Sequence, residues 1–200
     1  PSQRERATFA FGSEERLNWH YIPKPRQGLP RGDMDEVQLR AAEVLMAATL
    51  SQSGFDTSKA IIGHELILGR IESKEGVRRF DRSDDLYFFS VFGTPGRDGS
   101  WGWRVDGHHL SVNVTLTNGA IVSVTPSFFG ANPAEVKHGL EKGLRVLPAE
   151  EDLGRELFDA ANPPKRFYEV PGADHNDTYL VGGAAYHDAL AHFVNDPSGG

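Results

Sequence analysis

The chain contains no cysteine in its 200 residues. This excludes disulfide bonds, thiolate nucleophiles and cysteine-ligated zinc sites, and it leaves the redox state of the compartment open. An apolar run of about 18 residues, which a membrane-spanning helix needs, is missing as well. We therefore expect a soluble chain with no membrane partner. A leader removed ahead of the first residue would leave no mark, so the cytoplasm and an exported location both stay open.

Clusters of basic residues are also absent. The 21 Lys and Arg residues are outnumbered by 28 Asp and Glu residues, which gives a formal net charge of -7. Because a nucleic-acid surface requires Lys and Arg gathered on one face, we expect no nucleic-acid partner. The chain does hold 38% hydrophobic residues, including 12 Phe, which is enough to bury one core with at most a small appendage. Nothing in the composition predicts an oligomeric state.

The first third of the chain predicts two helices. Apolar residues recur at intervals of three and four between positions 37 and 50 and again between 61 and 68, with a Ser-Gly break at 53–54. Glu65 lies within the second apolar stripe. It is either a buried carboxylate that faces a cleft or an exposed residue at the edge of the stripe.

From about Leu86 the pattern alternates at every second residue and becomes aromatic and β-branched, which predicts a sheet. The expected strands span residues 86–92, 101–105, 108–117 and 120–126. Asn118 and Gly119 join the last two strands, because Asn-Gly adopts the backbone conformation of a type I′ turn. The register of such a hairpin would pair Thr115 with Val122.

A different pattern begins near residue 153. A short strand over 167–170, a loop rich in Gly, Asp, His and Asn, and a helix over 184–194 follow one another, as in an α/β protein. The sequence therefore predicts two parts. Residues 1–152 form an α+β domain in which N-terminal helices pack on a mostly antiparallel sheet. Residues 153–200 form a short α/β-like strand, loop and helix that is incomplete as a domain.

Several strings, in a fixed order, carry a resemblance to a known family. They are WHYIP (19–23), LSQSG (50–54), FFSVFGTPG (88–96), WGWRVDGHHLSVNVT (101–115), VTPSFFGANPAEV (124–136) and GLRVLPAEE (143–151). Together they resemble the domain-of-unknown-function family number three thousand five hundred, over about residues 5–152. This resemblance implies no particular activity, so the function has to be argued from the residues.

The last part of the chain, PKRFYEVPGADHNDTYLVGGAAYHDALAHFV (164–194), is instead similar to the C-terminal segment of α/β-hydrolases. There a final strand leads to a loop that carries the catalytic histidine, and a closing helix follows. The resemblance implies that His175 is the base of a catalytic triad, although Asp174 stands where the hydrolase pattern has Gly. The hydrolase fold also needs a Gly-x-Ser-x-Gly elbow, and this chain has none. The segment therefore lacks a recognisable nucleophile.

Two adjacent histidines, His108 and His109, are the strongest candidates for chemistry, since imidazole binds metals and exchanges protons near neutral pH. Neighbouring residues of a strand point to opposite faces, so the two would share one ion only if Gly107 opened a bulge. In a regular strand His108 would join the apolar row of Leu110, and His109 would join the polar row of Asn113. That polar row predicts the floor of a cleft, unless the two polar side chains merely satisfy each other.

We expect this cleft to bind a small molecule or a metal ion. The residues expected to line it are Glu65, Arg104, His109 and Asn113. A bound metal would be a divalent transition metal held by His109, with His108 as a further ligand. The sequence leaves open whether the protein is an enzyme. The alternatives are ester hydrolysis through His175 and a non-catalytic protein-interaction module that uses Trp101 and Trp103.

Overall fold

The computed structural model describes residues 2–76, 79–147, 184–185 and 188. The chain divides into two compact units, Pro1–Val146 and Leu147–Gly200. The expected boundary at 152/153, the strand over 167–170 and His175 lie outside the described residues. Of the helix expected over 184–194, three residues are described, and these are helical. All the described strands belong to the first unit.

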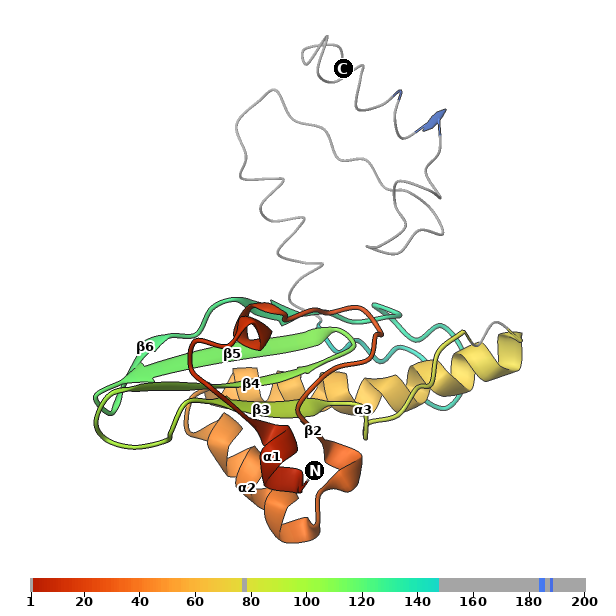
Figure 1. The fold of residues 1–200 in the computed structure, drawn as a ribbon. Coiled ribbons are helices and arrows are strands. Elements are labelled where there is room, and N and C mark those ends of the chain that lie inside the picture. Colours follow the sequence, from red (N-terminus) through yellow and green to blue (C-terminus); the bar gives the residue numbers. More distant parts are fainter. Residues whose placement is uncertain (1, 77–78, 148–183, 186–187, 189–200) are drawn as a thin grey trace, which may run out of the picture. The chain divides into compact units, whose positions relative to one another are not determined.

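A mixed seven-stranded sheet forms the centre of this unit (Figure 1). Its strands are β1 (Thr8–Phe9), β2 (Leu29–Pro30), β3 (Phe88–Phe92), β4 (Ser100–Gly107), β5 (Leu110–Thr117), β6 (Ala120–Ser123) and β7 (Ser127–Phe129). The order is β1-β3-β4-β5-β6, with β2 also paired to β3 and β7 to β5. Only β1 and β3 run parallel among these pairs. The α+β class and the mostly antiparallel sheet are therefore confirmed.

The helices precede most of the sheet in sequence. They are α1 (Gln3–Ala7), the 3-10 turns η1 (Glu14–Leu17) and η2 (Arg31–Asp33), α2 (Glu36–Ala47) and α3 (Gln52–Glu75). Asp35 and Gln38 form a reciprocal capping box at the start of α2, while Ser51 caps α3. Gly76 ends α3 in the left-handed conformation, with φ of 69°. None of the described helices combines the length and apolar character of a membrane span.

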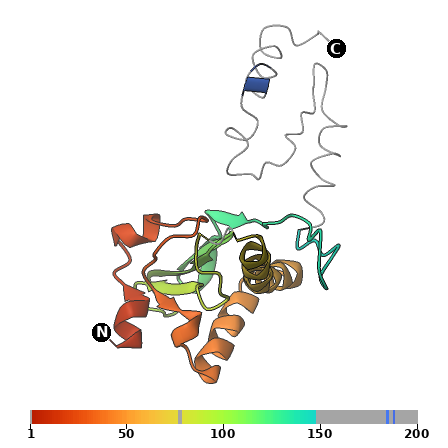
Figure 2. The ribbon, with the colours of Figure 1, turned by 90° about the vertical axis from the view of Figure 1, so that its right-hand side faces the viewer.

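The sheet is covered on both faces. Figure 2 shows α3 nearly end-on at one side of the strands and the N-terminal segment at the other. The apolar face holds five buried apolar residues of the two long strands: Trp103, Val105, Leu110, Val112 and Val114. The opposite face is also buried but polar, because Arg104 and Asp106 on β4 lie beside Ser111 on β5. Glu15 of the N-terminal segment pairs with Arg104 there, at 2.6 Å.

The β5–β6 hairpin has the predicted two-residue turn. Asn118 and Gly119 have φ of 50° and 77°, and Thr117 pairs with Ala120. The predicted register holds only next to the turn, because a bulge pairs Thr115 with Ser123 instead of Val122. One extra residue on β6 is the physical reason. Beyond the bulge, β7 takes over as the partner of β5.

Candidate functional site

The two histidines occupy a turn and not a strand. Gly107 pairs with Leu110, so His108 and His109 are the two residues that connect β4 to β5. His109 adopts a positive φ of 62°, and this places both rings on top of one another, with centroids 3.8 Å apart. The prediction that the two imidazoles point to opposite faces was therefore wrong. It assumed an extended backbone at a position where the chain reverses.

His108 belongs to a buried charged cluster beneath the turn. Its Nδ1 lies 2.7 Å from Oε2 of Glu65, which comes from the middle of α3. Arg82 approaches Oε1 of the same carboxylate at 3.1 Å, and it donates two further hydrogen bonds to Glu72, at 2.7 and 2.9 Å. These four side chains are between 5% and 14% exposed. Glu65 is thus the buried carboxylate, not the edge residue, of the two alternatives.

Charge pairing keeps Arg82 ionised. Burial alone would lower the pKa of Arg82, but the hydrogen bonds and charges of Glu72 and Glu65 outweigh burial, and the pKa is raised above its ordinary value. The guanidinium therefore stays protonated at all accessible pH values. A fixed positive charge at this point faces both carboxylates.

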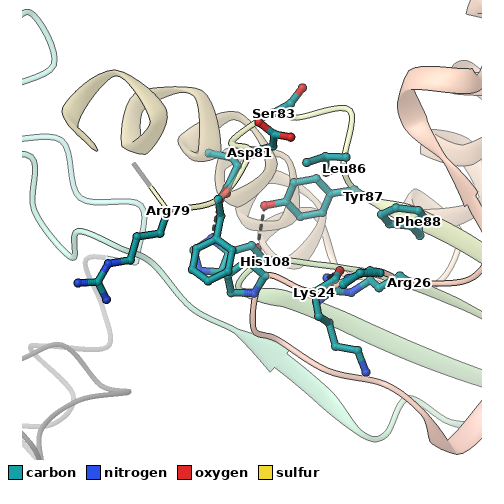
Figure 3. Close-up of a pocket in the computed structure, with 13 residues that line it drawn as sticks. Lys24, Arg26, Arg79, Asp81, Ser83, Leu86, Tyr87, Phe88 and His108 are labelled. Carbon is teal, nitrogen blue, oxygen red and sulfur yellow. Dashed lines mark hydrogen bonds and ion pairs between the residues drawn. The ribbon is translucent and has the colours of Figure 1, made fainter. Parts of the chain in front are cut away.

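A cavity of about 420 Å³ opens beside the cluster (Figure 3). This volume lies within the range of small-molecule sites, which is roughly 300–1,000 Å³. Glu65 and His108 line the cavity together with apolar groups that include Phe80 and Leu86. The wall is therefore largely apolar with a few convergent polar groups, as in ordinary ligand pockets.

Tyr87 anchors the turn formed by His108 and His109. Its hydroxyl donates a 2.8 Å hydrogen bond to the carbonyl oxygen of His108, and its ring lies so close to Gly107 that a Cβ there would meet it at 2.4 Å. Burial, reinforced by the charge of Glu65, raises the pKa of Tyr87 well above its ordinary value. The phenol is therefore a neutral donor. Glycine at position 107 and this hydroxyl together hold His108 in place.

Arg26 fixes the loop that forms another wall of the cavity. Its Nε donates to Asp106 at 2.9 Å, while Nη2 donates to the carbonyl oxygens of Gly107, His20 and Ile22 at 2.7 to 2.8 Å. One side chain thus ties the N-terminal loop to the end of β4. Burial raises the pKa of Asp106, and the neighbouring guanidinium groups of Arg104 and Arg26 act against that rise.

The four residues expected to line one cleft are not brought together. Glu65 lines the cavity, and so does His108, but Arg104, His109 and Asn113 do not. Arg104 is fully buried on the polar face of the sheet, in ion pairs with Glu15 and Asp106. Asn113 lies on that same face and donates to the carbonyl oxygen of Pro126 at 2.7 Å. The row pattern of the strands cannot show that Glu65 comes from a helix, or that His109 lies in the turn between β4 and β5 and not on a strand, so the predicted grouping was wrong.

A metal centre has no preformed ligand set in the described part of the chain. No group of three or more His, Asp or Glu side chains there has the spacing to hold an ion. The Nδ1 atom of His108 is engaged by Glu65. Histidine and carboxylate ligands usually come in sets of three or four, so two stacked imidazoles alone make a poor site.

Sequence reasoning missed three residues of the site. Arg82 sits in the charged run of positions 81–85, which reads as a solvated turn, yet its side chain is only 5% exposed. Tyr87 and Arg26 carried no motif at all. The turn at His108 and His109 did have a signal in the sequence, because the apolar residues of β4 and β5 are spaced symmetrically about positions 108–109, as they are in a hairpin.

Comparison with known proteins gives one match. Residues 1–177 match a family model whose description is a protein of unknown function. The match continues past residue 152, where the motifs had placed the end of the resemblance, and includes His175. No curated protein and no solved structure matches the chain. The comparisons therefore supply neither an activity nor support for the similarity to α/β-hydrolases.

Proposed function

Because the chain belongs to the DUF3500 family, whose description gives no activity, we propose its function from the site: an acid–base enzyme that acts on a small organic molecule. The ligand occupies the 420 Å³ cavity. His108 exchanges a proton with it, and Glu65 positions and polarises His108. The observation that carries this proposal is the 2.7 Å contact between the imidazole and the buried carboxylate at the cavity wall.

The contacts of Nδ1 assign the tautomer of His108. Glu65 can only accept a hydrogen bond as a carboxylate, whereas Arg82, 3.1 Å from the same nitrogen, can only donate. Both contacts cannot be hydrogen bonds at once. Both contacts involve an ionic partner, and the contact with the carboxylate of Glu65 is the shorter and therefore the stronger of the two. We infer that Nδ1 carries the proton. Nε2 of a neutral ring is then an acceptor, and it makes no hydrogen bond within the described residues.

An imidazole oriented by a carboxylate is a common general base. The carboxylate fixes the tautomer and stabilises the imidazolium that forms when Nε2 takes a proton. Here Arg82 shares the carboxylate, which moderates that stabilisation. The proton would come from the substrate itself or from a water molecule bound beside it. No side-chain nucleophile is required for such a reaction.

The other expectations receive less support from the geometry. Metal binding at Nε2 of His108 would leave the Nδ1 contact with Glu65 in place, but sharing one ion with His109 would require the two stacked rings to separate, and the described residues supply no third His, Asp or Glu ligand. An interaction module based on the tryptophans is not favoured, since Trp103 is 1% exposed and Trp101, half-buried, donates its indole N–H to the carbonyl oxygen of Gly96. Metal binding is one outcome of the tests below.

The proposal is tested first by nitrogen NMR of the histidine side chains. We expect His108 to show the Nδ1–H tautomer, and we expect its Nε2 resonance to shift when a small molecule found by thermal-shift screening is added. His108→Gln should remove that binding. His109→Gln is the matched control, because His109 stacks on His108 but does not line the cavity.

Two results would contradict the proposal. One is a screening ligand whose affinity is unchanged by His108→Gln, which would place the binding site elsewhere. The other is a divalent metal that binds at micromolar concentration and is lost in both histidine variants, which would restore the metal interpretation.

A further inference from the structure

The charges around the cavity differ in whether they already have a partner. Among the acidic side chains that line it, Glu65 is paired with Arg82, and Asp81 is engaged in an interaction of its own. Among the basic ones, Arg26 is buried against Asp106. The charges of Glu65 and Arg26 are therefore compensated within the protein, and Asp81 already has an interaction partner.

Two cations at the cavity lack such compensation. Among the described residues, the ammonium group of Lys24 forms a hydrogen bond only with the side-chain oxygen of Asn18, at 3.3 Å, and this acceptor is neutral. Arg79 forms no ion pair or side-chain hydrogen bond with any residue that the structure describes, and it is exposed. In Figure 3 these two residues lie on either side of His108, one from the N-terminal loop and the other from the segment after α3.

We propose that the ligand of this cavity is a small organic anion, with its anionic group held at the mouth by Lys24 and Arg79 and its apolar body against the cavity wall. This inference rests on the proposed function and names the class of substrate. The uncompensated positive charge at the mouth is favourable for one carboxylate or phosphate group, because a charge-assisted hydrogen bond is about twice as strong as a neutral one. Guanidinium and ammonium groups are the usual ligands of such anions.

The apolar wall selects the rest of the molecule. Phe80 and Leu86 line the cavity and are 46% and 39% exposed, so part of their apolar surface is open to a ligand. Pro23 and Pro25 add rigid apolar surface on the opposite loop. An aromatic or branched aliphatic body would bury these surfaces, and the far end of the molecule would then reach His108.

The charge of the ligand also agrees with the proposed chemistry. Glu65 and Glu72 are two carboxylates that share one guanidinium, Arg82, so these three side chains carry one net negative charge. A ligand anion placed at the cluster would be repelled. Placed at Lys24 and Arg79 it is attracted, which orients the molecule with its neutral, reacting end toward the imidazole.

Isosteric probes test this inference directly. We would measure the dissociation constants of phenylacetate and phenyl phosphate by calorimetry, together with those of the neutral phenylacetamide and the cationic phenethylamine. Both anions should bind at least tenfold more tightly than the amide, and the amine should bind more weakly still. The preference should shrink as salt is raised from about 0.05 to 0.5 M, because exposed charges are screened.

Charge-removing variants locate the anion. Lys24→Met and Arg79→Met should each weaken phenylacetate binding about tenfold and leave the amide within twofold. Arg97→Met and Lys142→Met are matched controls, since both residues are exposed and neither lines the cavity. These controls should leave both probes unchanged apart from a small effect of net charge.

The outcomes separate this inference from the proposal on which it rests. If the amide binds as tightly as the anions, and His108→Gln abolishes both, the anionic class is wrong while the cavity and its base stand. If phosphate binds but carboxylate does not, the anionic class stands and narrows to phosphate esters. If none of the four probes binds, or if binding ignores both His108 and the two cations, the inference and the proposed function fall together.

Discussion

Replacing Arg82 with methionine should destabilise the protein by about 3 kcal/mol or more. The side chain is 5% exposed and faces two carboxylates, Glu65 at 3.1 Å and Glu72 at 2.7 Å. Methionine keeps the apolar stem but removes the guanidinium, so two charges that are 7% and 14% exposed lose this partner. Removing one member of a buried ion pair costs about 3–5 kcal/mol, because the remaining charge is left desolvated.

A surface pair of the same type provides the control. Arg70, which lies on α3, forms an ion pair with Glu141, but the two side chains are 53% and 34% exposed. Exposed pairs of this kind contribute about 0–1 kcal/mol, so Arg70→Met should change stability by less than 1 kcal/mol. A rescue is also expected, since adding Glu65→Gln and Glu72→Gln to Arg82→Met removes both unpaired charges.

Urea unfolding followed by tryptophan fluorescence measures these differences, because Trp103 is buried in the sheet and becomes exposed on unfolding. The slope of the transition should stay constant, so that the midpoint reports stability alone. Arg82→Met and Arg70→Met with equal and small effects would refute the reasoning. That result would mean that the charged cluster is solvated, and the proposed positioning of His108 would lose its basis.

Three further predictions concern other parts of the chain. Burial lowers the pKa of His64 below its ordinary 6.5, so the unfolded chain takes up a proton first, and stability should fall as pH drops below about 6.5. His64→Gln should flatten that dependence in pH-resolved melts and leave the contribution of His20, whose pKa burial also lowers. Gly107→Ala should cost about 1–3 kcal/mol by clashing with the Tyr87 ring, and thermal melts in a Tyr87→Leu background should show a smaller loss. The hydrolase hypothesis requires turnover of a chromogenic ester that His175→Ala abolishes and a fluorophosphonate blocks; protein without turnover would reject it.

The periodicity of the sequence was enough to predict most of the fold. Apolar spacing predicted α2 and the middle of α3, and Asn118-Gly119 predicted its hairpin, because these features act within a few residues of each other. The expected break at Ser53-Gly54 was wrong, because both residues lie in the first turn of α3, which Ser51 caps. The bulge at Thr115 was out of reach, since no residue there signals it and it depends on the pairing of β7 with the far end of β5.

The site was predicted only in part, for a similar reason. Glu65 was predicted as a site residue because it is a carboxylate in an apolar stripe, and His108 because imidazole binds metals and exchanges protons. Both line the cavity. Their partner Arg82 is separated from them by 17 and 26 residues, and only tertiary packing brings it in. Residues whose role comes from a distant contact have no local signature to find.

Two buried charged networks can be compared within this unit, and the comparison favours a role in chemistry for one of them. Arg104 with Asp106 and Glu15 lies on the polar face of the sheet, where it ties the N-terminal segment to β4. This network reaches the cavity only through Arg26, the other partner of Asp106, and none of its three members lines the cavity. The cluster of Arg82 is also buried, and Glu65 and His108 within it line the cavity directly. Apolar residues of similar size would usually stabilise a fold at least as well as buried ions. The first network has a structural connection to explain its presence; the second has an imidazole and an open cavity, and acid–base chemistry explains both.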